Sequence, residues 1–217
     1  MAEFYWWSTN YSNPSRIGSF TDLKPEKGWN YELGVEKKLS QRYITKLTGF
    51  YQDITDYINF THQYPYSCYN ISDATIWGFE WENTYKLDDK SKLLLNYTNQ
   101  HTKKEGVVAG DNLGLKGELD YRPEHKITLG YQLDIDAWQL RYTMDYTGRQ
   151  KANYPYGSTS QVEIGGYVLH NLSVVRNLGS GRTVALTVDN LFDKQYVEQY
   201  NYPMPGRLVS VSFNQKL

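Results

Sequence analysis

Side chains able to catalyse a reaction or bind a metal are few and far apart in this chain. The 217 residues contain four histidines and one cysteine, Cys68. No two histidines are spaced i, i+4 and no Cys-x-x-Cys motif accompanies them, so the spacing predicts no structural metal site. Cys68 is either a free thiol or paired with a cysteine of another segment. The histidines are His62, His101, His125 and His170.

Two of these histidines can be matched with an acidic residue for acid–base chemistry. His101 with Asp111, or His62 with Asp73, could form a general acid–base pair. If the chain is a membrane barrel, such a pair would lie at its rim. Some outer-membrane proteases use Asp and His in this position. No motif of those proteases is present, so the sequence predicts a protein that is not an enzyme and has no cofactor.

Charged side chains recur at alternate positions of the predicted strands. Between Ala74 and Tyr85, aromatic residues alternate with Gly78 and two glutamates. A soluble antiparallel sheet also alternates, but the water-filled lumen of a barrel accepts glutamates that a soluble core does not need. These side chains either guide a ligand or pair across neighbouring strands. The residues expected to face the lumen are Glu32, Glu36, Glu80, Glu82, Arg141 and Asp145.

Tyrosine is the outlier of the composition, with 21 Tyr beside 6 Trp. Their placement favours two aromatic belts at membrane–water interfaces. Other tyrosines fall in predicted loops, where they form either a ligand platform or the packing of the loops themselves. These loop residues are Tyr64, Tyr66, Tyr69, Tyr154, Tyr156, Tyr200 and Tyr202.

The bulk properties exclude several classes of protein. A length of 217 residues favours one domain. The formal charge of -1, with acids and bases interspersed, gives no support for a nucleic-acid partner. No apolar run is long enough for a transmembrane helix, and no signal-peptide pattern opens the chain. Each strand of a membrane barrel needs only about 9–11 residues, so a β-barrel stays possible.

The spacing of turns and loops indicates which kind of barrel this is. Short turns near residues 40, 89, 135 and 180 alternate with long loops, an asymmetry typical of transmembrane barrels. A lipocalin-like soluble barrel would instead be apolar inside. Counting from the strand end at 3–11 gives about ten strands, so the predicted fold is all-β, an antiparallel transmembrane β-barrel. The long loops are expected at 12–26, 60–72, 103–112, 149–165 and 192–205.

The C-terminal segment carries the most specific motif. It reads NLFDKQY at 190–196, YPMPGR at 202–207 and VSVSF at 209–213. From Val209 onward apolar and polar residues alternate, which predicts a final strand. Together with YELGVE at 31–36 and GFYQDITDYI at 49–58, these motifs resemble TonB-dependent outer-membrane receptors, which import ferric siderophores and vitamin B12.

The resemblance implies that the last strand closes a barrel and carries the signal for the barrel-assembly machinery. Members of the family usually end in an aromatic residue, whereas this chain ends in Leu217. The Asn190–Tyr196 segment is expected to be structural rather than catalytic. The predicted barrel-closing residues are Gly206, Arg207, Val209, Val211, Phe213 and Leu217.

The resemblance also implies how much of a receptor is present. The family has a 22-stranded barrel with a plug inside it, and residues 1–217 resemble only the C-terminal part of that barrel. We therefore expect a partial barrel, whose partners are outer-membrane lipid, the missing plug and N-terminal barrel half, and TonB only through the plug.

The implied function is part of a Gram-negative outer-membrane receptor for a ferric siderophore, haem or cobalamin. The strand motifs are most similar to those of vitamin B12 and small catecholate-siderophore receptors. Energised transport in the family acts through the plug, so this chain should not transport alone. The alternative is a stand-alone small barrel, acting as a passive pore or a structural membrane protein.

Overall fold

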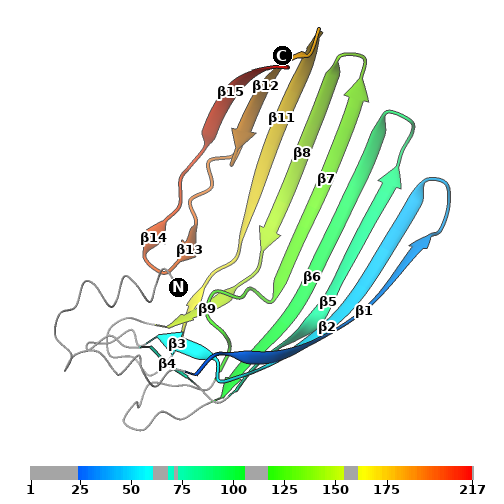
Figure 1. The fold of residues 1–217 in the computed structure, drawn as a ribbon. Helices are drawn as coiled ribbons and strands as arrows, with labels where there is room; N and C mark the ends of the chain where they lie inside the picture. Colours follow the sequence, from blue (N-terminus) through cyan, green and yellow to red (C-terminus); the bar gives the residue numbers. More distant parts are fainter. Residues whose placement is uncertain (1–23, 61–67, 71–72, 106–116, 154–160, 217) are drawn as a thin grey trace.

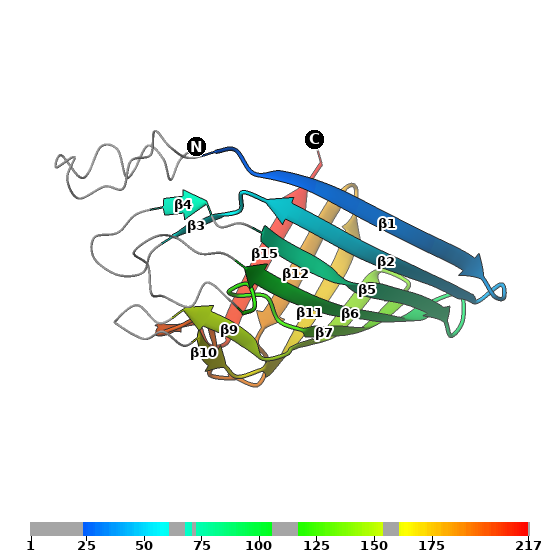
Figure 2. The ribbon, with the colours of Figure 1, turned by 90° about the horizontal axis from the view of Figure 1, so that it is seen from below.

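The computed structural model describes residues 24–60, 68–70, 73–105, 117–153 and 161–216. All the regular secondary structure in these ranges consists of β-strands. Nine strands form one antiparallel sheet, which curves like a trough with β1 and β15 at its two edges (Figures 1 and 2). In spatial order they are β1 (Lys27–Lys38), β2 (Tyr43–Thr55), β5 (Asp73–Lys86), β6 (Ser91–Glu105), β7 (His125–Ile135), β8 (Trp138–Thr147), β11 (Tyr167–Gly179), β12 (Arg182–Asp189) and β15 (Leu208–Gln215).

Three short hairpins lie beyond one end of this sheet, within the long loops. They pair β3 (Ile58–Phe60) with β4 (Cys68–Asn70), β9 (Gln150–Asn153) with β10 (Gln161–Ile164), and β13 (Val197–Gln199) with β14 (Tyr202–Pro203). The described residues contain no helix long and apolar enough to cross a membrane.

The prediction of an all-β antiparallel fold is confirmed. The strand predicted at residues 3–11 lies outside the described residues, so nine strands of the expected ten are seen in the main sheet. The short turns fall at 39–42, 87–90, 136–137 and 180–181, as predicted. Among the described residues β1 pairs only with β2, and β15 pairs only with β12, so both edges of the sheet are open.

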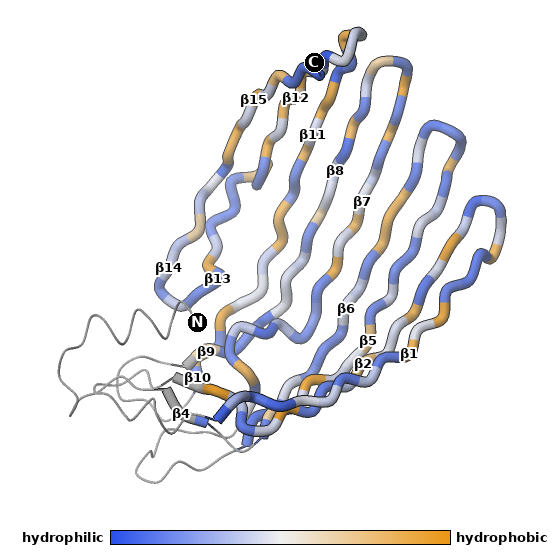
Figure 3. Tube along the Cα trace, viewed as in Figure 1, coloured by the Kyte–Doolittle hydropathy of each residue, from blue (hydrophilic) through white to orange (hydrophobic). Residues whose placement is uncertain are grey.

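The register gives the sheet an apolar and a polar face, and Figure 3 shows hydrophobic and hydrophilic residues interspersed along the strands. Because directly paired residues point to the same side of a sheet, the pairing can be followed from strand to strand. One apolar row consists of Val35, Leu47, Trp81, Tyr97, Ile127 and Tyr146. The polar row beside it consists of Glu36, Lys46, Glu82, Asn96, Thr128 and Asp145.

Aromatic side chains on the apolar face gather near both ends of the strands. Near the short turns, the rings of Tyr43 and Tyr85 lie 6.2 Å apart, and the Arg176 guanidinium lies 5.0 Å from the centre of the Trp138 ring. Near the long loops, the rings of Trp77 and His101 lie 5.6 Å apart and are tilted, and the ring of His125 stacks on that of Tyr97. Other aromatics, such as Phe79 and Tyr131, lie between these levels. Two such bands are the arrangement expected of side chains at two membrane–water interfaces.

The turn between β5 and β6 is organised by the Asp88 carboxylate. Its Oδ1 accepts hydrogen bonds from the backbone N–H groups of Lys90 and Ser91 at 2.8 and 2.7 Å, and from the Ser91 hydroxyl at 2.8 Å. The backbone hydrogen bond of Lys90, with that of the Ser91 side chain, lowers the pKa of Asp88 below its ordinary value. Asp88 therefore stabilises the turn only while it is ionised.

This lowered pKa predicts a pH dependence of stability at the turn. The contribution of Asp88 is fully present above the unfolded pKa of about 4 and is lost as the pH falls through the lower folded pKa. We expect Asp88→Asn, which keeps the shape of the side chain, to lower the thermal stability at pH 7. The difference from wild type should shrink steadily as the pH falls below about 4. Thermal unfolding between pH 7 and pH 2 measures this, and a pH-independent difference contradicts it.

The long loops contain more structure than the sequence indicated. Residues 149–165 and 192–205, predicted as loops, include the β9–β10 and β13–β14 hairpins. The prediction of a loop over 103–112 is wrong at its start, because β6 continues to Glu105. The buried apolar side chains of the described residues all lie at this end of the sheet, where loop segments pack on one another. They are Ala74, Leu119, Ala152 and Ile164.

The NLFD and GR motifs form a structural latch before the last strand. Asn190 is buried, its Oδ1 accepts from the Lys194 backbone N–H at 2.8 Å, and its Nδ2 donates to the Lys194 carbonyl at 2.9 Å. The Arg207 backbone N–H donates to Asp193 Oδ1 at 2.8 Å. The Arg207 N–H is therefore not available for a hydrogen bond to a neighbouring strand. β15 begins at Leu208, so the prediction that Gly206 and Arg207 belong to the final strand is wrong.

A side chain at position 206 would collide with this latch, since a Cβ on Gly206 would overlap Asp193 Oδ1. We expect Gly206→Ala to displace the carboxylate, break its bond to Arg207 and cost about 1–2 kcal/mol of stability. Denaturant unfolding measures the loss. Gly165→Ala is the matched control, because nothing lies within 4 Å of a Cβ there. Equal effects of the two substitutions would contradict the latch.

Candidate functional site

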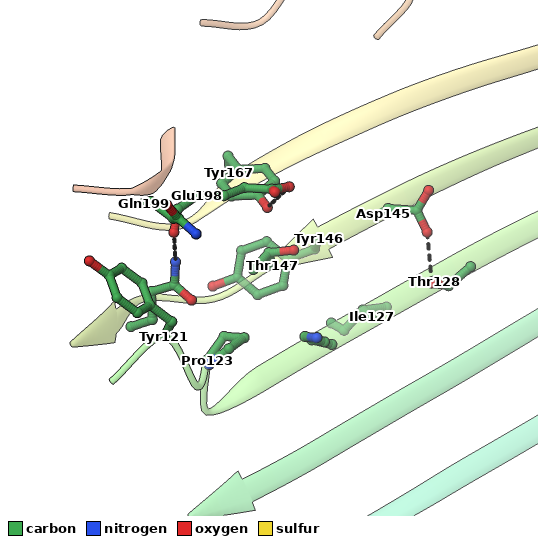
Figure 4. A pocket seen from close by; sticks show the side chains of 12 residues that line it. Tyr121, Pro123, Ile127, Thr128, Asp145, Tyr146, Thr147, Tyr167, Glu198 and Gln199 are labelled. Carbon is green, nitrogen blue, oxygen red and sulfur yellow. Dashed lines mark hydrogen bonds between the residues drawn. The ribbon is translucent and has the colours of Figure 1, made fainter. Parts of the chain in front are cut away.

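The polar face of the sheet is hollowed at its long-loop end by a pocket of about 450 Å³. Its floor lies on β7, β8 and β11, and the β13–β14 hairpin and the segment before β7 form its walls (Figure 4). The lining residues are Tyr121, Pro123, Lys126, Ile127, Thr128, Asp145, Tyr146, Thr147, Gln150, Tyr167, Glu198 and Gln199.

Hydrogen bonds tie the β13–β14 hairpin to β11 of the main sheet and to β9 beside this pocket. The Tyr167 hydroxyl donates to Glu198 Oε1 at 3.0 Å, and Gln150 Nε2 donates to the Glu198 carbonyl at 2.8 Å. The Tyr167 ring also lies 4.6 Å from the ring of Tyr196. The wall of the pocket is therefore held in place by contacts from two strands, which reduces the entropy that a ligand must remove on binding.

Tyr121 forms the opposite wall in a strained conformation. Its φ of 58° lies in the left-handed region, which bulky residues seldom adopt. A backbone bond from Tyr121 N–H to the Lys151 carbonyl, 2.8 Å long, holds it there. Partial burial raises the pKa of Tyr121, against the effect of a hydrogen bond with the Tyr200 backbone. The phenol thus stays protonated at neutral pH and can donate a hydrogen bond to a ligand.

Asp145, at the inner end of the pocket, is bound by three neutral donors. Its Oδ1 accepts from the Thr128 hydroxyl at 2.7 Å, and its Oδ2 accepts from Thr143 Oγ1 and Asn171 Nδ2, both at 3.1 Å. These bonds connect β7, β8 and β11. Asp145 therefore acts mainly as a tie between strands, with little capacity left for a ligand.

A second hollow of about 390 Å³ lies on the polar face of β1, β2 and β5. It brings Glu32 and Glu80 together with Lys46 and Arg122. Lys46 Nζ lies 3.0 Å from Glu82 Oε1, and both side chains are nearly half exposed, so this pair contributes little to stability. Glu36 is the direct cross-strand neighbour of Lys46. The register puts Arg141 on the same face, between Gln132 and Ser173.

The predicted aromatic platform is described only in part. Tyr69 lies in β4 opposite Asn59. Tyr200 and Tyr202 lie at the turn of the β13–β14 hairpin, next to Tyr121, and Tyr202 is 66% exposed. The remaining four, Tyr64, Tyr66, Tyr154 and Tyr156, lie outside the described residues, as does Leu217.

The histidines of the described residues lie on the apolar face rather than in the pocket. His101 Nδ1 is 3.2 Å from Glu124 Oε1, and His62 and Asp111 lie outside the described ranges. The Tyr97 and Tyr142 hydroxyls bond to His125 and His170 at 2.9 and 2.6 Å. Within the described part of the chain, no three His, Cys, Asp or Glu side chains are arranged to hold a metal ion.

Sequence reasoning identified Asp145, which lines the pocket, but missed the residues that form its walls. Tyr121, Tyr167 and Glu198 fall at a turn, a strand start and a short hairpin, where no periodic pattern exists to mark them. The only available signal was the density of tyrosine in the loops. Chemically, the pocket combines phenols, amides, hydroxyls and a few charges, a set that can bind a polar ligand.

An antiparallel sheet with an apolar outer face, short turns at one end and long loops at the other is the wall of a transmembrane β-barrel. The model of the TonB dependent receptor-like β-barrel family matches residues 1–191. The chain therefore belongs to the TonB-dependent receptor β-barrel family.

Solved structures similar to the chain agree in fold. The ferric-catecholate import receptor Fiu from E. coli K12, in its closed form, is 23% identical with a TM-score of 0.68, over 90% of this chain and 28% of its own. The copper transporter OprC is 19% identical with a TM-score of 0.72, over 90% of this chain and 33% of its own. The ferripyoverdine receptor of the Pseudomonas aeruginosa outer membrane is 18% identical with a TM-score of 0.65, over 88% and 27%. The chain thus spans about a third or less of each relative's length.

Proposed function

We propose that this chain forms part of the barrel wall of a Gram-negative outer-membrane receptor that takes up a small ligand. The ligand classes favoured are a ferric siderophore, haem or cobalamin. The observation that carries the proposal is the polar pocket at the long-loop end, whose phenols, amides and charges face the inside of a membrane barrel. Two proteins of similar fold are the ferripyoverdine receptor, solved with ferripyoverdine bound, and the ferric enterobactin receptor PfeA of Pseudomonas aeruginosa, which supports an iron chelate first.

The open edges of the sheet support a role within a larger barrel. A membrane leaves the N–H and C=O groups of an unpaired edge without partners, at a cost of several kcal/mol each. Further strands must therefore pair with β1 and β15. The relatives match the chain over about a third or less of their length, which favours completion by the remainder of a receptor barrel. The same remainder would supply the plug and the contact with TonB.

The pocket can be tested with three probes: ferric enterobactin, haemin and cyanocobalamin. The complete protein is titrated with each probe, and binding is followed by quenching of its intrinsic fluorescence. We expect saturable binding of one probe. Tyr167→Phe should weaken that binding roughly threefold to tenfold, the effect of losing one hydrogen bond that also positions Glu198.

The matched control is Tyr131→Phe, since Tyr131 lies on the apolar face of the same sheet, away from the pocket. It should leave the affinity unchanged. Absence of binding for all three probes, or equal effects of the two tyrosine substitutions, would count against the proposed receptor site.

A further inference from the structure

The apolar face carries a hollow of its own, separate from the ligand pocket. It measures about 480 Å³ and lies on β2, β5, β6 and β7, toward the short turns. Its sides are the rings of Tyr43, Trp81 and Tyr85, and its base is Leu95 with Leu129. A surface hollow of this size in lipid loses dispersion contacts unless a molecule fills it.

The hollow exists because a small polar residue occupies an apolar row. Asn83 stands between Thr45 and Leu95 in the register and is only 7% exposed. Its Oδ1 accepts from the Tyr43 and Thr45 hydroxyls, both at 2.8 Å, and its Nδ2 donates to the Leu95 carbonyl at 3.3 Å. The amide is thus drawn toward the backbone and leaves space above it.

The same amide keeps one hydrogen for an external acceptor. An asparagine side chain has two N–H donors, and the bond to the Leu95 carbonyl uses one of them. The described residues provide no acceptor for the other. The floor of an otherwise apolar hollow therefore holds one donor, which suits an ester carbonyl.

Lys37 places a positive charge near the hollow, on the same face of the sheet. Lys37 pairs with Thr45, and Thr45 pairs with Asn83, so all three occupy one row of the apolar face. Lys37 is exposed, and no ion pair joins it to the rest of the described chain. Its position beside the short turns is the level at which lipid headgroups meet a barrel.

We propose that this hollow binds one phospholipid of the membrane leaflet on the short-turn side. An acyl chain fills the space over Leu95 and Leu129, the Asn83 amide donates to a glycerol ester carbonyl, and Lys37 pairs with the phosphate region of an anionic headgroup. The proposal depends on the sheet lying in a membrane and not on ligand uptake.

The experiment uses the complete protein, delipidated in mild detergent and titrated with dioleoyl-phosphatidylglycerol, with native mass spectrometry counting bound lipid. Wild type should retain one molecule more tightly than any others. Leu129→Trp, which fills the hollow, should lower the affinity for that one lipid molecule at least tenfold. Leu140→Trp is the control, because Leu140 faces the same way on β8 and does not line the hollow.

Lys37→Gln tests the headgroup contact with an exposed residue whose replacement does not disturb packing. It should reduce the preference for phosphatidylglycerol over phosphatidylcholine by about fivefold, the effect of one cation near an anionic lipid. Lys27→Gln, on the same face at the other end of β1, should not. Equal lipid affinity in Leu129→Trp and wild type, or an unchanged headgroup preference in Lys37→Gln, overturns the site. Ligand binding by the receptor pocket does not enter either measurement.

Discussion

Replacement of Asp120 by alanine is expected to open the long-loop end of the barrel wall. Lys104 is 1% exposed, and its Nζ lies 3.1 Å from Asp120 Oδ2. Gln161 Nε2 donates to the other carboxylate oxygen at 2.9 Å. Removal of one partner of a buried ion pair leaves an uncompensated charge and costs about 3–5 kcal/mol. Hydrogen exchange of the backbone amides at 117–121 and 150–152 should show a loss of protection of this size.

Two comparisons make this prediction specific. Joint replacement, Lys104→Met with Asp120→Leu, should recover most of the protection, because an apolar pair of similar volume is often as stable as the ion pair. Lys103→Gln removes the neighbouring pair with Glu105, in which both side chains are more than half exposed, and should cost less than about 1 kcal/mol. A loss below that limit in Asp120→Ala would show that the pair does not hold the loops.

A positive charge on the outer face of β12 is expected to destabilise the barrel far more than one on the inner face. Leu186 pairs with Val174 and Val211 in an apolar row, whereas the adjacent Ala185 points to the opposite side. Arginine on the lipid face near the middle of a membrane costs about 2–4 kcal/mol. We therefore expect Leu186→Arg to lower the free energy of unfolding in vesicles by this amount.

Ala185→Arg is the matched comparison, since it adds the same charge one residue away but toward the polar face. It should change the free energy of unfolding by less than about 1 kcal/mol, because a water-filled lumen solvates the guanidinium. The two substitutions are compared by denaturant unfolding of the complete protein in lipid vesicles. Equal losses, or a larger loss in Ala185→Arg, would contradict the assignment of the two faces.

The sheet could be predicted because its information is local. Alternation along one strand decides which face each side chain takes, so the opposite directions of Trp81 and Glu82 were readable before any pairing was known. The four short turns were readable for the same reason, as polar breaks between alternating runs. The structure at the long-loop end of the sheet could not be predicted in this way. Lys104 belongs by composition to a charged loop, yet it is buried by segments that arrive more than a dozen residues later.

The pocket could not be predicted for a related reason. Tyr167 and Glu198 are separated by 31 residues and meet because a two-stranded hairpin folds back over β11. No periodic pattern of residue types along the sequence links two positions that far apart. Among the acidic residues predicted to face the lumen, the structure brings Glu32 and Glu80 into one hollow and gives Asp145 three hydrogen-bond donors of its own. Composition alone did not separate these two roles.

The odd number of strands in the main sheet restricts how its two open edges can be completed. In a sheet of nine antiparallel strands the first and last run the same way, so β1 and β15 both point toward the short turns. An all-antiparallel closed barrel therefore needs an odd number of additional strands. A second copy of the sheet in the same orientation would supply nine, but its β1 would lie parallel to β15, so it could not close an all-antiparallel barrel. If those strands precede β1 in the same polypeptide, the first of them must run antiparallel to β15 and begin at the short-turn end. A segment attached ahead of that strand would then enter the barrel from the side of the membrane on which β15 ends.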